Sequence, residues 1–392
     1  MFAENKQGLK ALIAASILQL FFGMIYIWGI FVIPVAETFS WDVEAVKLTA
    51  SFNIGFFVLG TFSGGKLQVR MGATKVTLLG GLMVAVGMLA SAFTPASVPW
   101  LLYITYGIVC GIGSGMGYIA GITAAQKWFP KRRGLATGLC VGAFGLSVSL
   151  FAPLIEFLLS VFTLQVTFFI LSASFATIIL LLGRFVRFPE ESAAQSAPLS
   201  GSIQYTTGQM VRTREFYRLT VSLLLVTVAF FVVIPAVQTL SIYRGFGASF
   251  ATALLVIVGF SNTLGRIVVP AFSDRIGNEV IVLILMTVTM LASAVLTFAS
   301  GILFVVMIAL IPICFGAALS IFPLLTADYF GMENLGANYG AIGIGFAFSA
   351  LVLPGVIGMS GSYTTRFVAV TILSVLGLFA MGPLALTARK RR

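Results

Sequence analysis

Arg266 is the residue whose chemistry most needs an explanation, because it lies inside an otherwise apolar run, GFSNTLGRIVVPAFSDRIG (259–277). A guanidinium at the centre of a membrane-spanning helix costs at least about 2.5–3.5 kcal/mol, so it normally faces a cavity or a partner. A guanidinium also binds a carboxylate through two parallel charge-assisted hydrogen bonds. The polar cluster Ser273-Asp274-Arg275 ends the same run. The pattern predicts an anion-binding group inside a membrane, with a polar loop beneath it.

An internal ion pair is the structural alternative for Arg266, but the sequence offers no carboxylate at the same depth. Arg266 precedes Asp274 by eight residues, about 12 Å along a helix, which is close to the middle of an apolar core about 30 Å thick. The other charge well inside an apolar run is Glu156, about 33 Å along its own helix and therefore about 20 Å from Arg266. Arg266 is predicted to bind an external carboxylate.

The composition indicates that these residues lie in a membrane protein. Of 392 residues, 59% are hydrophobic and 9% are charged, whereas soluble domains carry about 25% charged residues. Runs of about 20 apolar residues predict spanning helices. The predicted spans are 10–35, 45–67, 75–94, 99–124, 134–159, 163–186, 216–242, 249–272, 279–300, 302–327, 336–360 and 363–387.

A long polar stretch divides the spans six and six. Residues 187–214, RFPEESAAQSAPLSGSIQYTTGQMVRTR, are rich in Ser, Ala, Gln and Pro, a composition typical of a flexible linker. The sequence therefore predicts an N-terminal six-helix bundle at 1–186, a linker at 187–214 and a C-terminal six-helix bundle at 215–392.

The distribution of Lys and Arg predicts the orientation in the membrane. With the N-terminus in the cytoplasm, 19 of the 23 Lys and Arg residues fall on the cytoplasmic side, and only Lys47, Arg244 and Arg366 fall outside. Arg266 is the one that remains. Cytoplasmic loops are enriched in Lys and Arg. We therefore expect a multi-pass membrane protein with both termini and the linker in the cytoplasm.

The two halves resemble each other. The motif KWFPKRRGLATG (127–138) and the motif DYFGMENLGANYG (328–340) place Trp-Phe and Tyr-Phe pairs 201 residues apart, and Pro153 and Pro354 share that offset. Chance among Gly-rich helices is the alternative, but several matches at one offset favour a duplication. Parallel six-span repeats imply two bundles that expose a central site alternately. We expect an all-α polytopic membrane protein with twelve transmembrane helices in two pseudo-symmetric six-helix bundles.

These motifs resemble the major facilitator superfamily. FSDRIG (272–277) is similar to that superfamily's signature between spans two and three, here in the second-half copy. A closer similarity, to the branch of monocarboxylate transporters and oxalate/formate antiporters, lies in GMIYIWGIF (23–31), YGIVCGIGSGMGYIAG (106–121), NTLGR (262–266) and the two motifs quoted above. Within that branch the chain looks like a bacterial proton-coupled L-lactate transporter, which implies a location in the bacterial inner (plasma) membrane.

The resemblance implies that Arg266 is the carboxylate ligand, but this sequence departs from the family's pattern in three places. Val69 stands where the first-half signature usually has an aspartate. Asn262, one helical turn from Arg266 on the same face, stands where the animal transporters usually have an aspartate, a proposed proton carrier. The lysine of their first span has no counterpart, because that span carries no basic residue after Lys10. The resemblance therefore supports the substrate class better than the proton mechanism.

Other polar and aromatic residues are candidates for the cavity around Arg266 and Asn262. Tyr118 could donate a hydrogen bond to the acid, and Asn53 lies near mid-depth, where an amide needs a partner. Tyr26 and Trp28 belong to the span-one motif, although aromatic residues in apolar helices often serve packing alone. Weaker candidates are Leu146, Phe322, Phe346 and Ser349.

The loop charges at the cytoplasmic ends are candidates for a gate. Asp274 and Arg275 follow span eight, and Arg70 occupies the corresponding loop of the first half. Pairs between helices at these positions would hold the inner side closed, whereas the alternative is ordinary solvated loop charge. We favour the gate because the surrounding sequence carries the superfamily motif.

Several functions are disfavoured. The net charge of +11 lies in loops between apolar runs, which argues for topology rather than nucleic-acid binding. Histidine is absent and the three cysteines, Cys110, Cys140 and Cys314, lie in apolar spans without metal-ligand spacing. The run GIGSGMG (111–117) follows no strand and is rejected as a nucleotide-binding loop. We expect no enzyme activity, no cofactor and no bound metal.

The sequence thus favours a proton-linked transporter of a small monocarboxylate, with L-lactate as the first candidate, that works by alternating access and as a monomer. Its partners would be the anion, a proton and the lipid bilayer. An organic-anion exchanger of the oxalate/formate type is the alternative, although a dicarboxylate would favour a second buried cation. A carboxylate sensor that does not transport is a more distant alternative, because no soluble output domain is visible.

Overall fold

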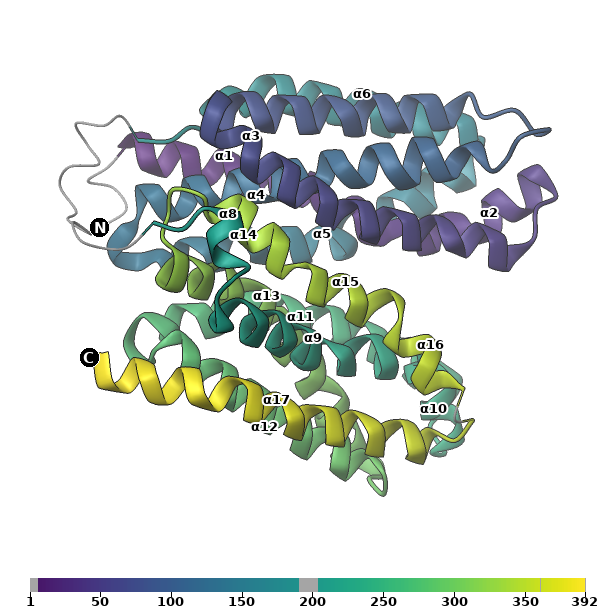
Figure 1. Cartoon of the computed structure of the whole chain (residues 1–392). Coiled ribbons are helices and arrows are strands. Elements are labelled where there is room, and N and C mark those ends of the chain that lie inside the picture. Colours follow the sequence, from purple (N-terminus) through teal and green to yellow (C-terminus); the bar gives the residue numbers. More distant parts are fainter. Residues whose placement is uncertain (1–5, 190–203, 360, 392) are drawn as a thin grey trace.

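The computed structural model describes residues 6–189, 204–359 and 361–391, and within these ranges the chain folds into helices and connecting turns without a strand. Eleven helical segments among the described residues are long and apolar enough to cross a membrane. One of them, Val43–Ala92, is 50 residues long and holds two spans. The structure therefore contains the twelve spans that the hydropathy predicts (Figure 1).

The N-terminal bundle begins with a span made of two helices joined by a 3₁₀ turn, and its fourth span begins with a π-helical segment, Tyr103–Cys110. Its helices are α1 (Lys6–Phe22), α2 (Trp28–Phe39), α3 (Val43–Ala92), α4 (Gly111–Trp128), α5 (Arg133–Val161) and α6 (Leu164–Leu182). α3 reverses direction at Gly72, whose φ of 79° and ψ of 164° are accessible to glycine and strained for other residues. The predicted loop between spans two and three is thus a single-residue break.

The C-terminal bundle follows a short helix, α8 (Thr207–Met210). Its helices are α9 (Arg214–Val233), α10 (Val237–Tyr243), α11 (Ala248–Ile276), α12 (Asn278–Leu296), α13 (Gly301–Phe330), α14 (Leu335–Ile342), α15 (Ile344–Leu351), α16 (Leu353–Gly358) and α17 (Tyr363–Arg391). The predicted span 336–360 is therefore three short helices rather than one. It is interrupted at Gly343 and again at Val352, two residues before Pro354, whose ring nitrogen has no N–H to donate to a carbonyl of the preceding turn. Residue 360 lies outside the described part of the chain.

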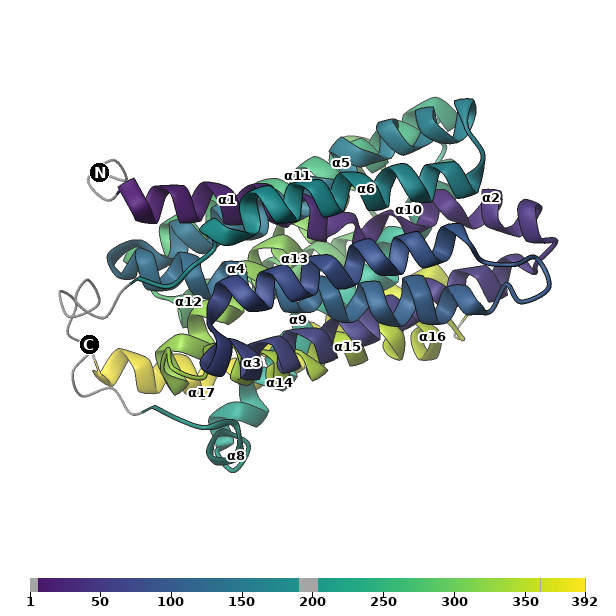
Figure 2. The ribbon, with the colours of Figure 1, turned by 90° about the horizontal axis from the view of Figure 1, so that it is seen from above.

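The helices run side by side along the long axis of the molecule (Figures 1 and 2). α1 begins and α17 ends at the same end, which we call the terminal end; α2, α10 and α16 lie toward the opposite end (Figure 1). The larger cluster of buried apolar side chains is continuous through both bundles, whereas a second cluster consists only of C-terminal residues from Val228 to Val370. The two bundles therefore share a core over only part of their length.

The prediction of a flexible linker at 187–214 falls partly on residues 190–203, which lie outside the described residues. Its described flanks are bound to the bundles. The indole Nε1 of Trp128 donates a 2.6 Å hydrogen bond to the carbonyl of Arg187, and the amide of Tyr205 donates one of 3.0 Å to the carbonyl of Phe330. The described flanks of the linker are therefore held against the bundles and are not flexible.

Candidate functional site

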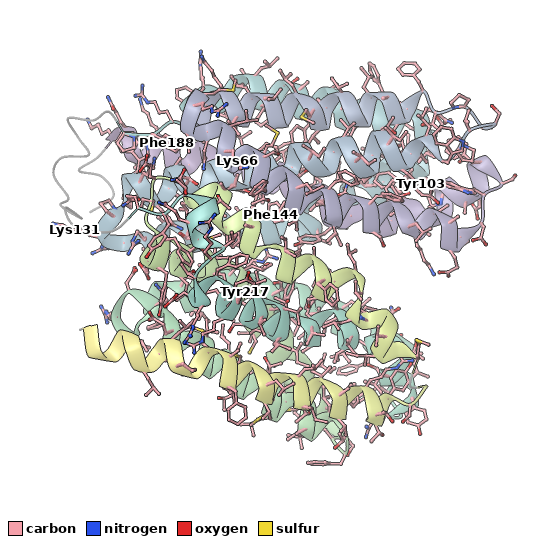
Figure 3. The ribbon with its side chains drawn as sticks, viewed as in Figure 1. Lys66, Tyr103, Lys131, Phe144, Phe188 and Tyr217 are labelled. Carbon is pink, nitrogen blue, oxygen red and sulfur yellow. The ribbon has the colours of Figure 1, made fainter. Side chains whose placement is uncertain are left out.

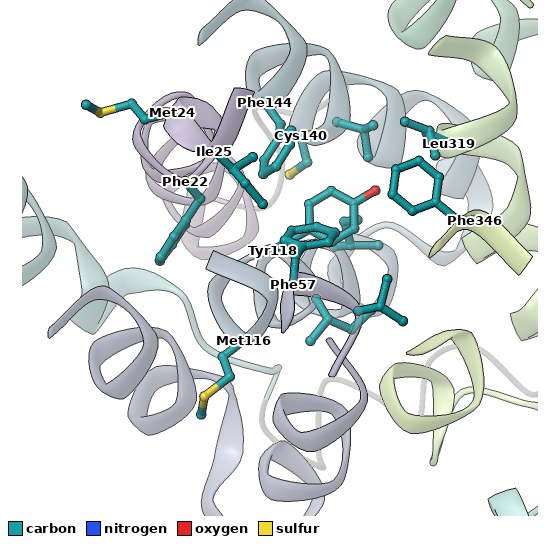
Figure 4. Packing of buried hydrophobic residues seen from close by; sticks show 14 of the residues in the cluster. Phe22, Met24, Ile25, Phe57, Met116, Tyr118, Cys140, Phe144, Leu319 and Phe346 are labelled. Atoms are coloured by element: carbon teal, nitrogen blue, oxygen red, sulfur yellow. The ribbon is translucent and has the colours of Figure 1, made fainter. Parts of the chain in front are cut away.

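A cavity lies between the two bundles. Half of its lining comes from the N-terminal bundle and half from the C-terminal bundle, and most of it is aromatic or aliphatic. The lining residues are Tyr26, Phe57, Val58, Thr61, Tyr118, Phe144, Arg266, Leu319, Tyr339, Gly340, Gly343 and Phe346. Phe57, Tyr118 and Phe144 lie together opposite Leu319 and Phe346 (Figure 4). An apolar pocket with a few polar groups is the usual form of a small-molecule site.

Arg266 is the one charged residue of the lining, and its side chain is fully buried. Its Nε donates a hydrogen bond of 3.2 Å to Asn262 Oδ1, one helical turn away. Its Nη1 donates one of 3.3 Å to the main-chain carbonyl of Val141 in the other bundle. Within the described part of the chain, its Nη2 has no hydrogen-bond partner. The guanidinium is thus anchored by two neutral acceptors and keeps unused donors.

Arg266 has internal hydrogen-bond partners, although the sequence offers it no carboxylate at its depth. Its partners are an amide oxygen and a carbonyl, and neither carries a charge that could neutralise the guanidinium. No carboxylate pairs with Arg266 among the described residues, and Glu156 is exposed far along α5, as its position in the sequence predicts. The positive charge of Arg266 therefore remains without a counter-charge in the cavity.

Two glycines create the slot that holds Arg266. A Cβ atom on Gly145 of α5 would lie 2.7 Å from the Cδ of Arg266, and one on Gly316 of α13 would lie 3.0 Å from its Cγ. Both distances are shorter than carbon–carbon contact, at about 3.5 Å or more. Because Gly145 lies one turn after Val141, the missing side chain also exposes the Val141 carbonyl to the guanidinium. The glycine-rich spans thus position the cation as well as the helices.

Aromatic rings surround the guanidinium on the side of the N-terminal bundle. Its carbon lies 6.0 Å from the ring centroid of Tyr26 and 5.9 Å from that of Phe144, at the outer limit for a cation–π interaction. Phe144 lies in the middle of the molecule, between the bundles (Figure 3). Tyr118 and Tyr339 come from opposite bundles, with ring centroids 6.5 Å apart. Hydroxyl donors therefore face the cavity together with the cation.

Four residues predicted for the cavity line it: Arg266, Tyr26, Tyr118 and Phe346. Asn262 lies beside the cavity and binds Arg266. Sequence reasoning missed Tyr339 although the predicted span 336–360 contains it, because the sequence does not say which face of that span meets the cavity. Thr61 and Phe57 also escaped, since nothing in the sequence says which face of α3 meets the other bundle.

Asn53 and Trp28 do not line the cavity, contrary to the prediction. The Asn53 amide donates a 2.8 Å hydrogen bond to the carbonyl of Tyr106, and the Trp28 indole donates one of 2.9 Å to the carbonyl of Val46. Both side chains are buried within the N-terminal bundle. Their polar atoms satisfy main-chain carbonyls of neighbouring helices, which is a structural role.

Three weaker predictions for the cavity are also wrong. Phe322 is fully buried in the core, and Ser349 is buried against Thr227, whose hydroxyl lies 3.0 Å from that of Ser349. Leu146 is 43% exposed and is absent from the lining. It follows Gly145 directly, so it points about 100° away from the slot around the helix axis.

Polar contacts join the two bundles at the terminal end. The guanidinium of Arg133 at the start of α5 pairs with Asp328 at the end of α13 at 2.6 Å, and the amide of Asn278 donates to the other oxygen of Asp328 at 2.6 Å. The carboxylate of Asp274 accepts a hydrogen bond of 3.1 Å from the amide of Gly134. This amide is in the first turn of α5, where the helix dipole favours a negative charge.

The three predicted gate residues do not all take part in the contact at the terminal end. Asp274 bridges the bundles, whereas Arg275 and Arg70 are exposed and no hydrogen bond or ion pair joins them to another described residue. The cation of the terminal contact is instead Arg133, from the motif KWFPKRRGLATG. The backbones of Gly65 in α3 and Gly336 in α14 also meet here, so closely that a Cβ on Gly65 would overlap the main chain of Gly336.

Replacing Asp328 with asparagine should weaken the terminal contact by a modest amount. The side chains of Arg133 and Asp328 are 22% and 26% exposed, so solvent screens the pair and its loss should change the balance of joined and separated states by about threefold to fivefold. The measurement is the distance distribution between spin labels at Lys131 and Tyr217, on opposite bundles (Figure 3). Glu44→Gln, which removes the exposed Lys47–Glu44 pair within α3, is the matched control.

Comparisons with known proteins agree with this architecture. The family model described as Major Facilitator Superfamily matches residues 12–354. The uncharacterised MFS-type transporter YhjX of Escherichia coli is 28% identical over 351 residues, which cover 87% of this chain and 85% of that protein. The oxalate:formate antiporter of Oxalobacter formigenes is 25% identical over 334 residues, which cover 84% and 78%.

A mammalian relative and a solved structure are also similar. Monocarboxylate transporter 13 of Bos taurus is 27% identical over 273 residues, which cover 69% of this chain and 62% of that protein. The crystal structure of the transporter FucP in the outward conformation superposes with a TM-score of 0.73 at 14% identity, over 96% of this chain and 99% of that one. At that identity the superposition speaks for the fold alone.

Proposed function

The chain belongs to the major facilitator superfamily, and from that premise we propose that it is a secondary transporter that carries a small monocarboxylate, L-lactate in the first instance, together with a proton. The observation that carries this proposal is Arg266, a buried guanidinium with unused donors and no counter-charge in a cavity shared by both bundles. A bound carboxylate would supply the missing charge and accept hydrogen bonds from Nη2.

The rest of the cavity favours a small acid with one carboxylate. Its lining contains a single cation, so a second carboxylate would be buried without a counter-charge, which is strongly unfavourable. The phenols of Tyr118 and Tyr339 are available to a substrate hydroxyl or keto oxygen. The Thr61 hydroxyl donates to the carbonyl of Phe57 at 2.9 Å and can accept from a substrate hydroxyl. The aromatic walls suit a short carbon chain. These features together support lactate and related acids.

The transport cycle follows from the contacts at the terminal end. We infer that this end is cytoplasmic, in a bacterial inner membrane, because the predicted cytoplasmic Lys and Arg residues that the structure describes belong to it. The joined bundles then represent a state in which the cytoplasmic path to the cavity is closed. Large exposed apolar side chains such as Val86, Leu180 and Phe379 face the lipid. A single chain holds the whole cavity, so we propose a monomer.

The cavity lining contains no carboxylate that could carry the proton. We propose that the proton crosses on the substrate itself, bound to its carboxyl group, because the ion pair of guanidinium and carboxylate carries no proton and the lining offers no other acid. A relay through Glu37, Asp42 or Glu156 is the alternative. All three are exposed toward the opposite end of the N-terminal bundle, and Asp42 caps the start of α3.

Anion exchange is the second candidate function. It is favoured by the similarity to the oxalate:formate antiporter and by the absence of an acid from the cavity lining. An exchanger needs a substrate on both sides and no proton gradient. The two functions therefore differ in what drives uptake.

Reconstituted vesicles distinguish these functions. We expect labelled L-lactate to accumulate when the proton concentration is higher outside and to reach only equilibrium when a protonophore removes the gradient. Preloading with unlabelled lactate should accelerate exchange without being required for net uptake. Uptake that depends on preloading and ignores the proton gradient would replace symport with exchange, and binding without any uptake would indicate a sensor.

A further inference from the structure

The segment Gln204–Met210, which we call the strap, lies against the turn between α13 and α14. The amide of Tyr205 donates to the carbonyl of Phe330 at 3.0 Å, and the Gln204 side chain accepts from the amide of Glu333 at 3.0 Å. The turn makes room for Gln204 at Gly331, whose φ is 83° and where a Cβ would overlap the Gln204 amide group. The strap is therefore fitted to this turn through the main chain of both segments.

Asn338 in α14 is the buried anchor of the strap. Its Nδ2 donates a 3.0 Å hydrogen bond to the carbonyl of Tyr205, and its Oδ1 accepts one of 2.9 Å from the hydroxyl of Thr207. Asn334 adds a longer bond, 3.3 Å, to the same Tyr205 carbonyl. The Asn338 side chain is fully buried, so a lost partner would leave a polar atom without water to replace it.

α14 packs most extensively against α3 of the other bundle and less against the helices of its own bundle. It is eight residues long, no side chain caps its start, and its last residue precedes the break at Gly343. Nevertheless its residues meet both the cavity and the terminal contact. Tyr339, next to Asn338, lines the cavity with Gly340, and Gly336 packs against Gly65 of the other bundle. A small shift of α14 would therefore move a cavity phenol and the bundle contact together.

We propose that the strap positions α14, and that Asn338 is the positioning residue through which it sets Tyr339 in the cavity. The inter-bundle connection then has a second role besides joining the halves, because its final segment controls the geometry of the binding site. The part of this proposal that concerns substrate affinity rests on the proposed function. The part that concerns α14 itself does not.

Substitutions at the strap test both parts in the full-length protein. Thr207→Val removes the hydroxyl but keeps the shape, and Asn338→Leu removes both bonds. Thr207→Ser keeps the donor and is the conservative rescue. Thr287→Val is the matched control, because the Thr287 hydroxyl binds only the carbonyl of Leu283 within α12.

Hydrogen–deuterium exchange of peptides covering residues 335–342 is the first readout. We expect exchange on the order of tenfold faster in Thr207→Val and Asn338→Leu, and native exchange in Thr207→Ser and Thr287→Val. A native rate of exchange in Asn338→Leu would contradict the proposal that the strap positions α14. This readout needs no substrate, so it decides the strap even if the wild-type protein fails to take up lactate, which would overturn only the proposed function.

Lactate uptake kinetics are the second readout. We expect the KM of Thr207→Val to rise about fivefold while its maximal rate stays within about twofold, because a displaced phenol weakens binding more than it slows the motion of the bundles. Faster exchange of α14 with an unchanged KM would overturn the positioning role. A fall in maximal rate alone would do the same, since it would assign the strap to the moving contact instead of the cavity.

Discussion

Arg266→Gln should reduce the initial rate of L-lactate uptake by about 100-fold. Losing one partner of a buried, hydrogen-bonded charge pair costs about 2–5 kcal/mol, and tenfold in affinity corresponds to about 1.4 kcal/mol. Glutamine can still bind Asn262 but offers no positive charge to the anion. The measurement is labelled lactate uptake into vesicles at matched protein content, with a thermal shift in detergent as the direct test of binding.

Two further variants test whether the loss of uptake is specific to the guanidinium of Arg266. Arg266→Lys keeps the charge but loses the planar fork, so uptake should fall between the native and glutamine proteins. Arg214→Gln changes an exposed arginine at the start of α9 and should transport normally. If the folded Arg266→Gln protein still shows the native lactate-dependent thermal shift, the carboxylate binds elsewhere and the assignment of Arg266 is wrong.

Gly65→Ala should reduce uptake by about 50-fold. Its new Cβ would occupy the main chain of Gly336, and because both surfaces are backbone, neither can rotate aside. Overpacking of this kind costs about 1–3 kcal/mol or more, which falls on the joined state alone. The bundles should therefore remain apart at the terminal end. Spin labels at Lys131 and Tyr217 should report a longer distance together with the slower uptake.

Gly55→Ala is the matched control on the same helix. A Cβ there would lie 3.5 Å from a methyl group of Leu351, an ordinary van der Waals contact, so uptake and the spin-label distance should stay native. The three native cysteines are buried, so spin labels attach to the introduced positions. A native distance distribution in Gly65→Ala would show that the Gly65–Gly336 contact does not control closure.

Much of the fold could be predicted because the membrane restricts it to apolar helices of fixed length. Hydropathy locates spans but says little about how helices end. The break at Gly72 and the interruptions at Gly343 and Val352 depend on backbone dihedral angles that apolar composition does not encode. The sequence therefore predicts twelve spans and misjudges the continuity of two regions.

The residues of the candidate site likewise include some that the sequence predicts and others that it does not. Arg266 stands out because a charge in an apolar run is costly whichever way the helix faces. Asn53 and Trp28 were misassigned because a polar atom at mid-depth is equally well explained by a carbonyl of the next helix. Tyr339 was missed although it lies inside the predicted span 336–360, since its cavity position depends on which face of α14 meets the cavity. The free-energy cost of burying a charged side chain can be inferred from the residue type. The direction in which a side chain faces is known only from the packed structure.

The hydrogen bond from Arg266 to the carbonyl of Val141 has a consequence for how the halves hold together. Neither half alone possesses a complete receptor, because one contributes the cation and the other contributes its main-chain acceptor and most of the aromatic wall. A ligand that needs both halves strengthens their association by mass action. Lactate should therefore raise the temperature at which two separately expressed halves, once combined, come apart, without stabilising either half by itself.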